Sequence, residues 1–137
     1  MRIMIDANVI LDVLSRRENF YLDSLNIFRL CETRQIEGHI SALSIANIVK
    51  ILRKEITNNK IEDIVNFLNN IFVIDDLQRE DIASAIKTNF SDFEDALQIE
   101  CAKRIDADYI ISRDLKHYTK SPITALEPRE LIIKFEN

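Results

Sequence analysis

The chain has 137 residues, of which 47% are hydrophobic and 30% charged, and its formal net charge is -5 at pH 7. These values are typical of a soluble globular protein and exclude a disordered chain, and the apolar runs are far shorter than the ~20 residues of a membrane span. The acidic balance argues against a protein that coats nucleic acids, but it is compatible with an enzyme whose carboxylates gather around metal ions. Because Asp6 also interrupts the N-terminal segment too early for a signal peptide, we expect a single cytoplasmic domain over residues 1–137, without membrane contact.

Strands and helices are predicted to alternate along the chain. The sequence contains one glycine and two prolines, which favours short, helix-rich connections over the hairpins of an all-β protein. Strands separated by helices imply right-handed crossovers, and hence a three-layer α/β/α sandwich around a mostly parallel sheet of four to five strands. The predicted strands are 2–5, 36–41, 71–75, 108–112 and 123–126, and the predicted helices are 8–15, 21–33, 43–54, 61–70, 79–88, 91–104 and 128–135.

Aspartates stand at or near the carboxyl ends of these strands. Asp6 ends the first strand, and Asp114 follows the fourth, while Asp92 and Asp95 lie in the first turns of the helix at 91–104. Ligands bind at the carboxyl edge of such a sheet, so these acids are expected to converge there. Gathered carboxylates repel one another unless a cation neutralises them, and hard ions such as Mg²⁺ or Mn²⁺ prefer oxygen ligands. The pattern therefore predicts phosphodiester hydrolysis with water activated by a divalent ion.

Several of these acids also have a structural interpretation. The segment SDFE matches a capping box, in which Ser91 caps the helix and Glu94 reaches back, while Asp92 interacts favourably with the helix dipole. The i, i+3 spacing of Asp92 and Asp95 places them on one face, which alone is weak evidence for a site. Asp12 lies well inside the first predicted helix, and we expect it to be a cap or a solvent-exposed charge rather than a ligand.

Other reactive side chains are predicted to be structural. The two cysteines, Cys31 and Cys101, belong to no CxxC motif or Cys/His cluster and are expected to be small core residues. His39 lies on a predicted strand and is also expected to be structural. Loop or helix-end charges are expected at Asp75, Asp76, Asp81, Asp106 and Asp108.

Four segments of the sequence resemble the PIN domain family, which includes the VapC-type toxins of bacterial toxin–antitoxin pairs. They are IDANVILDVL, HISALSIANIVKIL, DFEDALQIECA and DYIISRD, in the order and spacing of that family. The resemblance implies an α/β/α fold with ribonuclease activity that depends on Mg²⁺ or Mn²⁺, held by Asp6, Asp95 and Asp114 with the assistance of Asp92. It also implies RNA as the substrate, a homodimer, and a small antitoxin protein as partner.

Supporting roles follow from the same resemblance. Asn8 is expected to orient the first acid, and Ser112 to place a hydroxyl beside the turn of Asp114. Among the basic residues, Arg113 is the favoured contact to RNA phosphates because it adjoins that acid, and Lys116 is a second candidate. Arg16, Arg17 and Arg53 are further candidates, although each of these charges is at least as well explained as solvated surface.

The chain departs from the family pattern at two positions. Many PIN domains carry a glutamate on the helix after the second strand, and Asn47 occupies the matching position here. An amide oxygen can contact a metal or water but supplies no negative charge, and Glu55, two turns further along, is a poor substitute. His117 stands where the turn after the fourth strand often carries a second acid, and a solvent-facing or phosphate-contacting role is expected for it.

Three functions are therefore compared. The favoured one is a metal-dependent ribonuclease. The second is a catalytically weakened or inactive PIN module that binds RNA or a protein partner, which the substitution at Asn47 keeps open. The third is a receiver-like domain, but such a domain has an acidic pair after its first strand, where this chain has Asp6-Ala7-Asn8.

Overall fold

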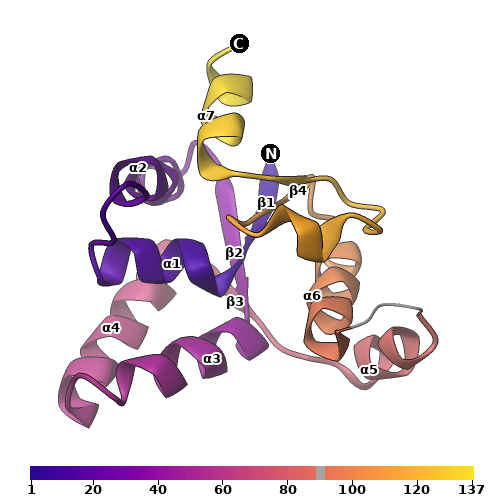
Figure 1. The fold of residues 1–137 in the computed structure, drawn as a ribbon, viewed down its shortest axis with the longest axis horizontal. Coiled ribbons are helices and arrows are strands. Elements are labelled where there is room, and N and C mark those ends of the chain that lie inside the picture. Colours follow the sequence, from indigo (N-terminus) through magenta and orange to yellow (C-terminus); the bar gives the residue numbers. More distant parts are fainter. Residues whose placement is uncertain (89–91) are drawn as a thin grey trace.

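The strands form one parallel sheet that carries helices on both faces in this computed structural model (Figure 1). The structure describes residues 1–88 and 92–137, and within them the strand order is β3-β2-β1-β4-β5 with every neighbouring pair parallel. The predicted three-layer α/β/α sandwich with four to five parallel strands is confirmed. The strands are β1 (Arg2–Ile5), β2 (Glu37–Ser41), β3 (Val73–Asp75), β4 (Tyr109–Ile111) and β5 (Ala125–Leu126). The helices are α1 (Ala7–Leu14), α2 (Tyr21–Glu32), α3 (Ala42–Leu52), α4 (Asn58–Ile71), α5 (Arg79–Ile86), α6 (Phe93–Arg104), the 3₁₀ turn η1 (Leu115–Tyr118) and α7 (Pro128–Glu136).

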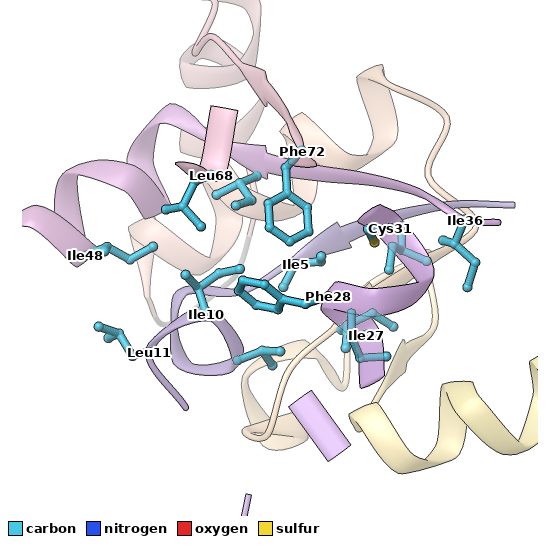
Figure 2. Packing of buried hydrophobic residues seen from close by; sticks show 14 of the residues in the cluster. Ile5, Ile10, Leu11, Ile27, Phe28, Cys31, Ile36, Ile48, Leu68 and Phe72 are labelled. Carbon is cyan, nitrogen blue, oxygen red and sulfur yellow. The ribbon is translucent and has the colours of Figure 1, made fainter. Parts of the chain in front are cut away.

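Alternate residues of β1 build the two halves of the core. Ile5 faces the larger cluster, where Ile10 of α1 and Phe28 of α2 meet it together with residues of α3, α4 and α7 (Figure 2). Met4 faces the opposite side, where it packs with Ile99 of α6. Because both faces are covered, β1 reads as an unbroken apolar run rather than as an alternating one.

Polar side chains begin the helices that surround the carboxyl edge of the sheet. The Asp6 carboxylate accepts the Ala7 amide at the start of α1, and the Ser41 hydroxyl accepts the Ser44 amide at the start of α3, at 2.8 and 3.1 Å. Asp92 is the N-cap of α6. The cap expected at Ser91 lies outside the described residues.

Several elements differ from the predictions. The helix α4 begins at Asn58, inside the predicted polar turn, and includes Ile71, so the third strand begins two residues later than predicted. The helix α3 ends at Leu52 rather than at residue 54, so Glu55 lies beyond the helix. The turn η1 at Leu115–Tyr118 was not predicted, since a single turn is too short to show helical periodicity. In the part of the chain that the structure describes, no helix has the length and apolar character needed to cross a bilayer.

The cysteines lie in the core, as predicted, and burial raises the pKa of both thiols to about 12. The Cys31 side chain is also one reason why residue 38 is a glycine. A Cβ atom at Gly38 of β2 would lie 2.5 Å from Cys31 Sγ and 2.8 Å from Phe72 Cδ1, so a side chain there would displace its neighbours. His39 on the same strand lies between the carboxylates of Asp75 and Glu37, which confirms its structural role.

Candidate active site

An open cavity of about 520 Å³ lies at the carboxyl edge of the sheet, where β1 and β4 end. Its lining includes Asp6, Asp92, Asp95 and Asp114, so the structure brings the four predicted acids to one place. This is also where the strand order reverses, because β1 pairs with β2 on one side and with β4 on the other. Within residues 1–88 and 92–137, no three Asp, Glu, His or Cys side chains are already gathered at metal-binding distance.

Asp6 is held by three hydrogen bonds. Its Oδ1 accepts the Ala7 amide, and its Oδ2 accepts the Ser112 hydroxyl and the Tyr118 hydroxyl, each at 2.9 Å. Burial, together with the charge of Asp6, raises the pKa of Tyr118 well above its usual range, so the phenol stays protonated and donates. These bonds offset the cost of a carboxylate at the end of a buried strand. Tyr118 was not predicted, because its only local signal is a hydroxyl-bearing aromatic residue after the fourth strand.

Asn8 and Ser112 connect β1 to the turn that carries Asp114. The amide nitrogen of Asn8 donates to Ser112 Oγ at 3.2 Å, and its amide oxygen accepts the Arg113 backbone N–H at 3.1 Å. Ser112 Oγ in turn accepts the Asp114 backbone N–H at 3.0 Å. Asn8 therefore contacts Ser112 and the following turn, and it reaches Asp6 through the Ser112 hydroxyl.

His117 lies between two of the acids. Its Nδ1 is 3.3 Å from Asp95 Oδ2, and its Nε2 is 3.0 Å from Asp114 Oδ2. Partial burial raises the pKa of Asp95, His117 opposes this effect, and the charges of Asp92 and Asp6 raise the pKa further. The negative charges are thus close enough to act on one another, which favours a cation in the cavity.

A buried polar contact joins the helices on the other side of the cavity. Asn47 of α3 is half-buried and lines the cavity, whereas Glu55 does not. Near the start of that helix, Ser41 Oγ donates to Gln98 Oε1 at 2.6 Å. Gln98 lies on α6 one turn after Asp95, so this bond links the start of α3, the helix of Asn47, to α6, the helix of Asp95. Gln98 was not predicted, since a polar residue in a helix gives no sign of a partner 57 positions away.

The basic residues around the cavity differ from those expected. The Arg113 and Lys116 side chains are not among its lining residues, although both were the favoured substrate contacts. Arg17, which was among the further candidates, lines it together with Lys50 and Lys54, which were not predicted. The spacing of Asn47 and Lys50, three residues apart on one helix, was a local signal for this placement.

The structure contradicts the prediction for Asp12. It was expected to cap a helix or face solvent, but its side chain is fully buried. Its Oδ2 accepts Arg113 Nε at 2.7 Å and Ser24 Oγ at 3.1 Å, and its Oδ1 lies 3.6 Å from Arg17 Nη1. The prediction was wrong because α2 and the turn after β4 cover the face of α1 that carries this acid.

Residues 2–116 match the family model described as PIN domain. The chain belongs to the PIN domain family. PIN domains are nucleases, so this membership agrees with the acidic cavity that the fold creates. A comparison with curated proteins gives no significant match.

Solved structures share the fold of this PIN domain at low sequence identity. VapBC2 from Rickettsia felis, bound to a DNA fragment from their promoter, is 14% identical, with 93% of this chain and 98% of that chain covered and a TM-score of 0.68. FitAcB from Neisseria gonorrhoeae is 15% identical, with the same coverages and a TM-score of 0.70. VapC20 from Mycobacterium tuberculosis, a sarcin-ricin loop cleaving toxin, is 8% identical, with 79% and 86% covered and a TM-score of 0.63.

Proposed function

We propose that this PIN domain is an endoribonuclease that depends on Mg²⁺ or Mn²⁺ and acts as the toxin of a toxin–antitoxin pair. The observation that carries the proposal is the position of Asp6, Asp92, Asp95 and Asp114 around one open cavity at the carboxyl edge of the sheet. Family membership supports nuclease chemistry. The fold shared with toxins such as VapC20 supports the toxin role.

The donor atoms of the cavity fit a divalent cation. Among the described residues, five carboxylates line the cavity, those of Glu94 and the four aspartates. Together with the Asn47 amide they supply hard oxygen donors, which suit Mg²⁺ and Mn²⁺. The ion would be held by Asp6, Asp95 and Asp114. Asp92 would assist with its Oδ2 atom, because its Oδ1 atom accepts the amides of α6. A bound ion would supply activation of water and would offset charge on the phosphate.

The remaining side chains orient the acids and the substrate. The Ser112 and Tyr118 hydroxyls hold Asp6 with its charge directed at the cavity. His117, whose two ring nitrogens contact Asp95 and Asp114, would orient these two acids. Arg17, Lys50 and Lys54 would contact phosphates of the RNA backbone, which positions the strand without reading its sequence.

The basic side of the cavity has its own test. The double variant Lys50→Ala/Lys54→Ala should raise KM and lower the salt dependence of RNA binding by about one unit of slope for each lost phosphate contact, with little change in kcat. Lys60→Ala, an exposed lysine outside this cavity, is the matched control. An unchanged KM in the double variant would remove these lysines from the substrate site.

A second candidate is a PIN module that binds RNA or a protein partner without cutting. Asn47 favours it, since an amide without negative charge stands where many PIN domains carry a glutamate. The His117 ring between Asp95 and Asp114 also favours it, because it already neutralises part of their charge when protonated.

One experiment separates the two candidates. The purified protein is incubated with structured RNA and Mn²⁺, alongside Asp6→Ala and the surface control Asp76→Ala, whose side chain is 77% exposed. The nuclease proposal expects cutting by the wild type and Asp76→Ala that chelation and Asp6→Ala abolish. RNA binding without cutting would favour the second candidate, and cutting that survives Asp6→Ala would overturn the assignment of the site.

The expected partners and location belong to the same proposal. We expect a cytoplasmic homodimer that a small antitoxin inhibits, in line with the toxin–antitoxin complexes that share the fold. A neighbouring reading frame for a small DNA-binding protein would support this role. Adding the encoded protein should then abolish RNA cutting, and sedimentation should report the mass of a dimer.

A further inference from the structure

A buried ion pair links the two chain segments that carry Asp6 and Asp114. Asp12, which is fully buried, lies on α1, the helix that Asp6 begins. Arg113 directly precedes Asp114. Its Nε donates to Asp12 Oδ2 at 2.7 Å, across 101 positions of sequence.

Further contacts fix the Arg113 side chain. The centre of its guanidinium lies 4.0 Å from the ring centroid of Phe20, which is the distance of a cation–π contact. The Asp12 oxygen that it meets is also bonded to the Ser24 hydroxyl of α2 at 3.1 Å. The guanidinium is therefore held both by a charged hydrogen bond and by an aromatic face.

Neighbouring side chains of this turn lie in different places. Asp114 lines the acidic cavity, whereas Arg113 lines a separate pocket of about 180 Å³ with Phe20 and Ser24. Consecutive Cα atoms are only about 3.8 Å apart, so a displacement of Arg113 moves Asp114 with it. Anchoring Arg113 on one side therefore constrains the acid on the other.

We infer that Asp12 and Arg113 are positioning residues, whose ion pair holds the turn after β4 so that Asp114 faces Asp6 across the cavity. Stability alone does not account for the pair, because well-packed apolar residues often replace a buried ion pair without loss. The pair instead fixes the orientation of the turn after β4, because a carboxylate and a guanidinium bond only in defined geometries. The consequence for catalysis rests on the proposed nuclease function, whereas the effect on the turn does not.

The protein offers a matched control pair. Asp81 of α5 is 3% exposed and its Oδ2 lies 3.0 Å from Arg104 Nη2 of α6. Neither residue lines the acidic cavity. Substitutions in the Asp81–Arg104 pair therefore measure what losing a buried ion pair does on its own.

The test compares Asp12→Asn, Arg113→Met and Arg113→Lys with Asp81→Asn and Arg104→Met in full-length protein that is folded by circular dichroism. Three quantities are measured: amide exchange of Arg113 and Asp114, Mn²⁺ affinity without RNA, and kcat and KM for RNA cutting.

We expect Asp12→Asn and Arg113→Met to speed amide exchange at the turn at least tenfold. Mn²⁺ affinity and kcat should fall about 10–100-fold, as for other residues that orient metal ligands, while the KM of Arg113→Met stays unchanged. The KM of Asp12→Asn is outside this expectation, because Asp12 Oδ1 also lies 3.6 Å from Arg17 Nη1. Arg113→Lys, which keeps the charge, should recover part of each loss.

Each alternative gives a different result. Unchanged exchange at the turn in Asp12→Asn, or equal losses of Mn²⁺ affinity and kcat in the Asp81 and Arg104 variants, would overturn the inference. A raised KM in Arg113→Met that Asp12→Asn does not reproduce would instead make Arg113 a direct RNA contact. If the wild type neither binds Mn²⁺ nor cuts RNA, the proposed function fails, and amide exchange still decides whether the ion pair holds the turn.

Discussion

The two walls of the acidic cavity are built in different ways. The inner wall lies at the ends of β1 and β4 and is built from Asp6, Asn8, Ser112 and Asp114. Hydrogen bonds between segments more than 100 residues apart connect it. The outer wall is formed by Asn47 of α3 and by Asp92 and Asp95 at the start of α6. Among the described residues it has no hydrogen bond of that span, and its one contact to the turn after β4 is that of Asp95 with His117. The hydrogen bonds that the structure describes for Asp92 are to amides of its own helix.

The two walls therefore differ in what sets the positions of their side chains. On the inner wall, geometry is set before any ligand arrives, because each polar group already has a fixed partner. On the outer wall, position depends on how α3 and α6 pack, and Asn47 reduces the charge available to a cation. Substitutions on the inner wall should therefore affect both stability and activity, whereas those on the outer wall should mainly tune metal affinity.

The largest difference is expected between Asp6→Asn and Asp92→Asn. Asp6→Asn removes a negative charge from the cation site, so RNA cutting should fall about 10³-fold. It also replaces one carboxylate oxygen by an NH₂ group, which cannot accept the bonds that the Ser112 and Tyr118 hydroxyls donate, so the unfolding free energy should fall by about 1–3 kcal/mol. Asn caps helices as well as Asp does, so Asp92→Asn should retain stability and lose about tenfold in activity. RNA cleavage and urea unfolding measure both quantities, and equal effects of the two variants would erase the distinction between the walls.

Ser41→Ala tests the buried bond beneath the outer wall. The change removes the cap of α3 and leaves Gln98 Oε1 without its donor, so we expect a loss of about 1–3 kcal/mol in unfolding free energy. Ser44→Ala is the matched control, because Ser44 Oγ makes only the longer contact of 3.3 Å with Ser41 Oγ, whose single proton is donated to Gln98. A loss as large in Ser44→Ala would show that the bond to Gln98 contributes little.

Asn47→Glu should strengthen the weaker wall. An added carboxylate on the cavity lining is expected to raise Mn²⁺ affinity about tenfold, or roughly 1.4 kcal/mol, because it places an opposite charge near the cation. Titration calorimetry measures the affinity. Asn47→Gln, which changes length without charge, should leave it nearly unchanged, and a gain in both variants would point to side-chain reach rather than charge.

Tyr118→Phe should have the smallest effect. The variant removes one of three donors to Asp6, and Ser112 and the Ala7 amide remain, so we expect a loss of about 1 kcal/mol in stability and a few-fold in kcat. Tyr109→Phe on β4 is a control of the same chemistry away from the cavity lining. Thermal unfolding and cleavage rates of the two variants provide the comparison.

Much of the site was predictable because its signals are local. Asp6 follows an apolar strand and Asp114 follows another, and parallel strands bring such positions to one edge whatever the details of packing. Asn47 was identified from the family resemblance, as the polar residue that stands where many PIN domains carry a glutamate. Asp12 and Tyr118 were not predictable, since what they do depends on Arg113 and Asp6, more than 100 positions away.

The sequence by itself determined the order of strands and helices, the parallel sheet, and the meeting of four aspartates at its carboxyl edge. Hydrophobic periodicity and strand-end acids specify these features through short-range geometry. Only the tertiary structure decided that Arg113 pairs with a buried Asp12 and that Lys50 and Lys54 line the cavity instead. The physical reason is that side-chain partners are chosen by how helices dock on the sheet, and docking sums contacts that no local pattern contains.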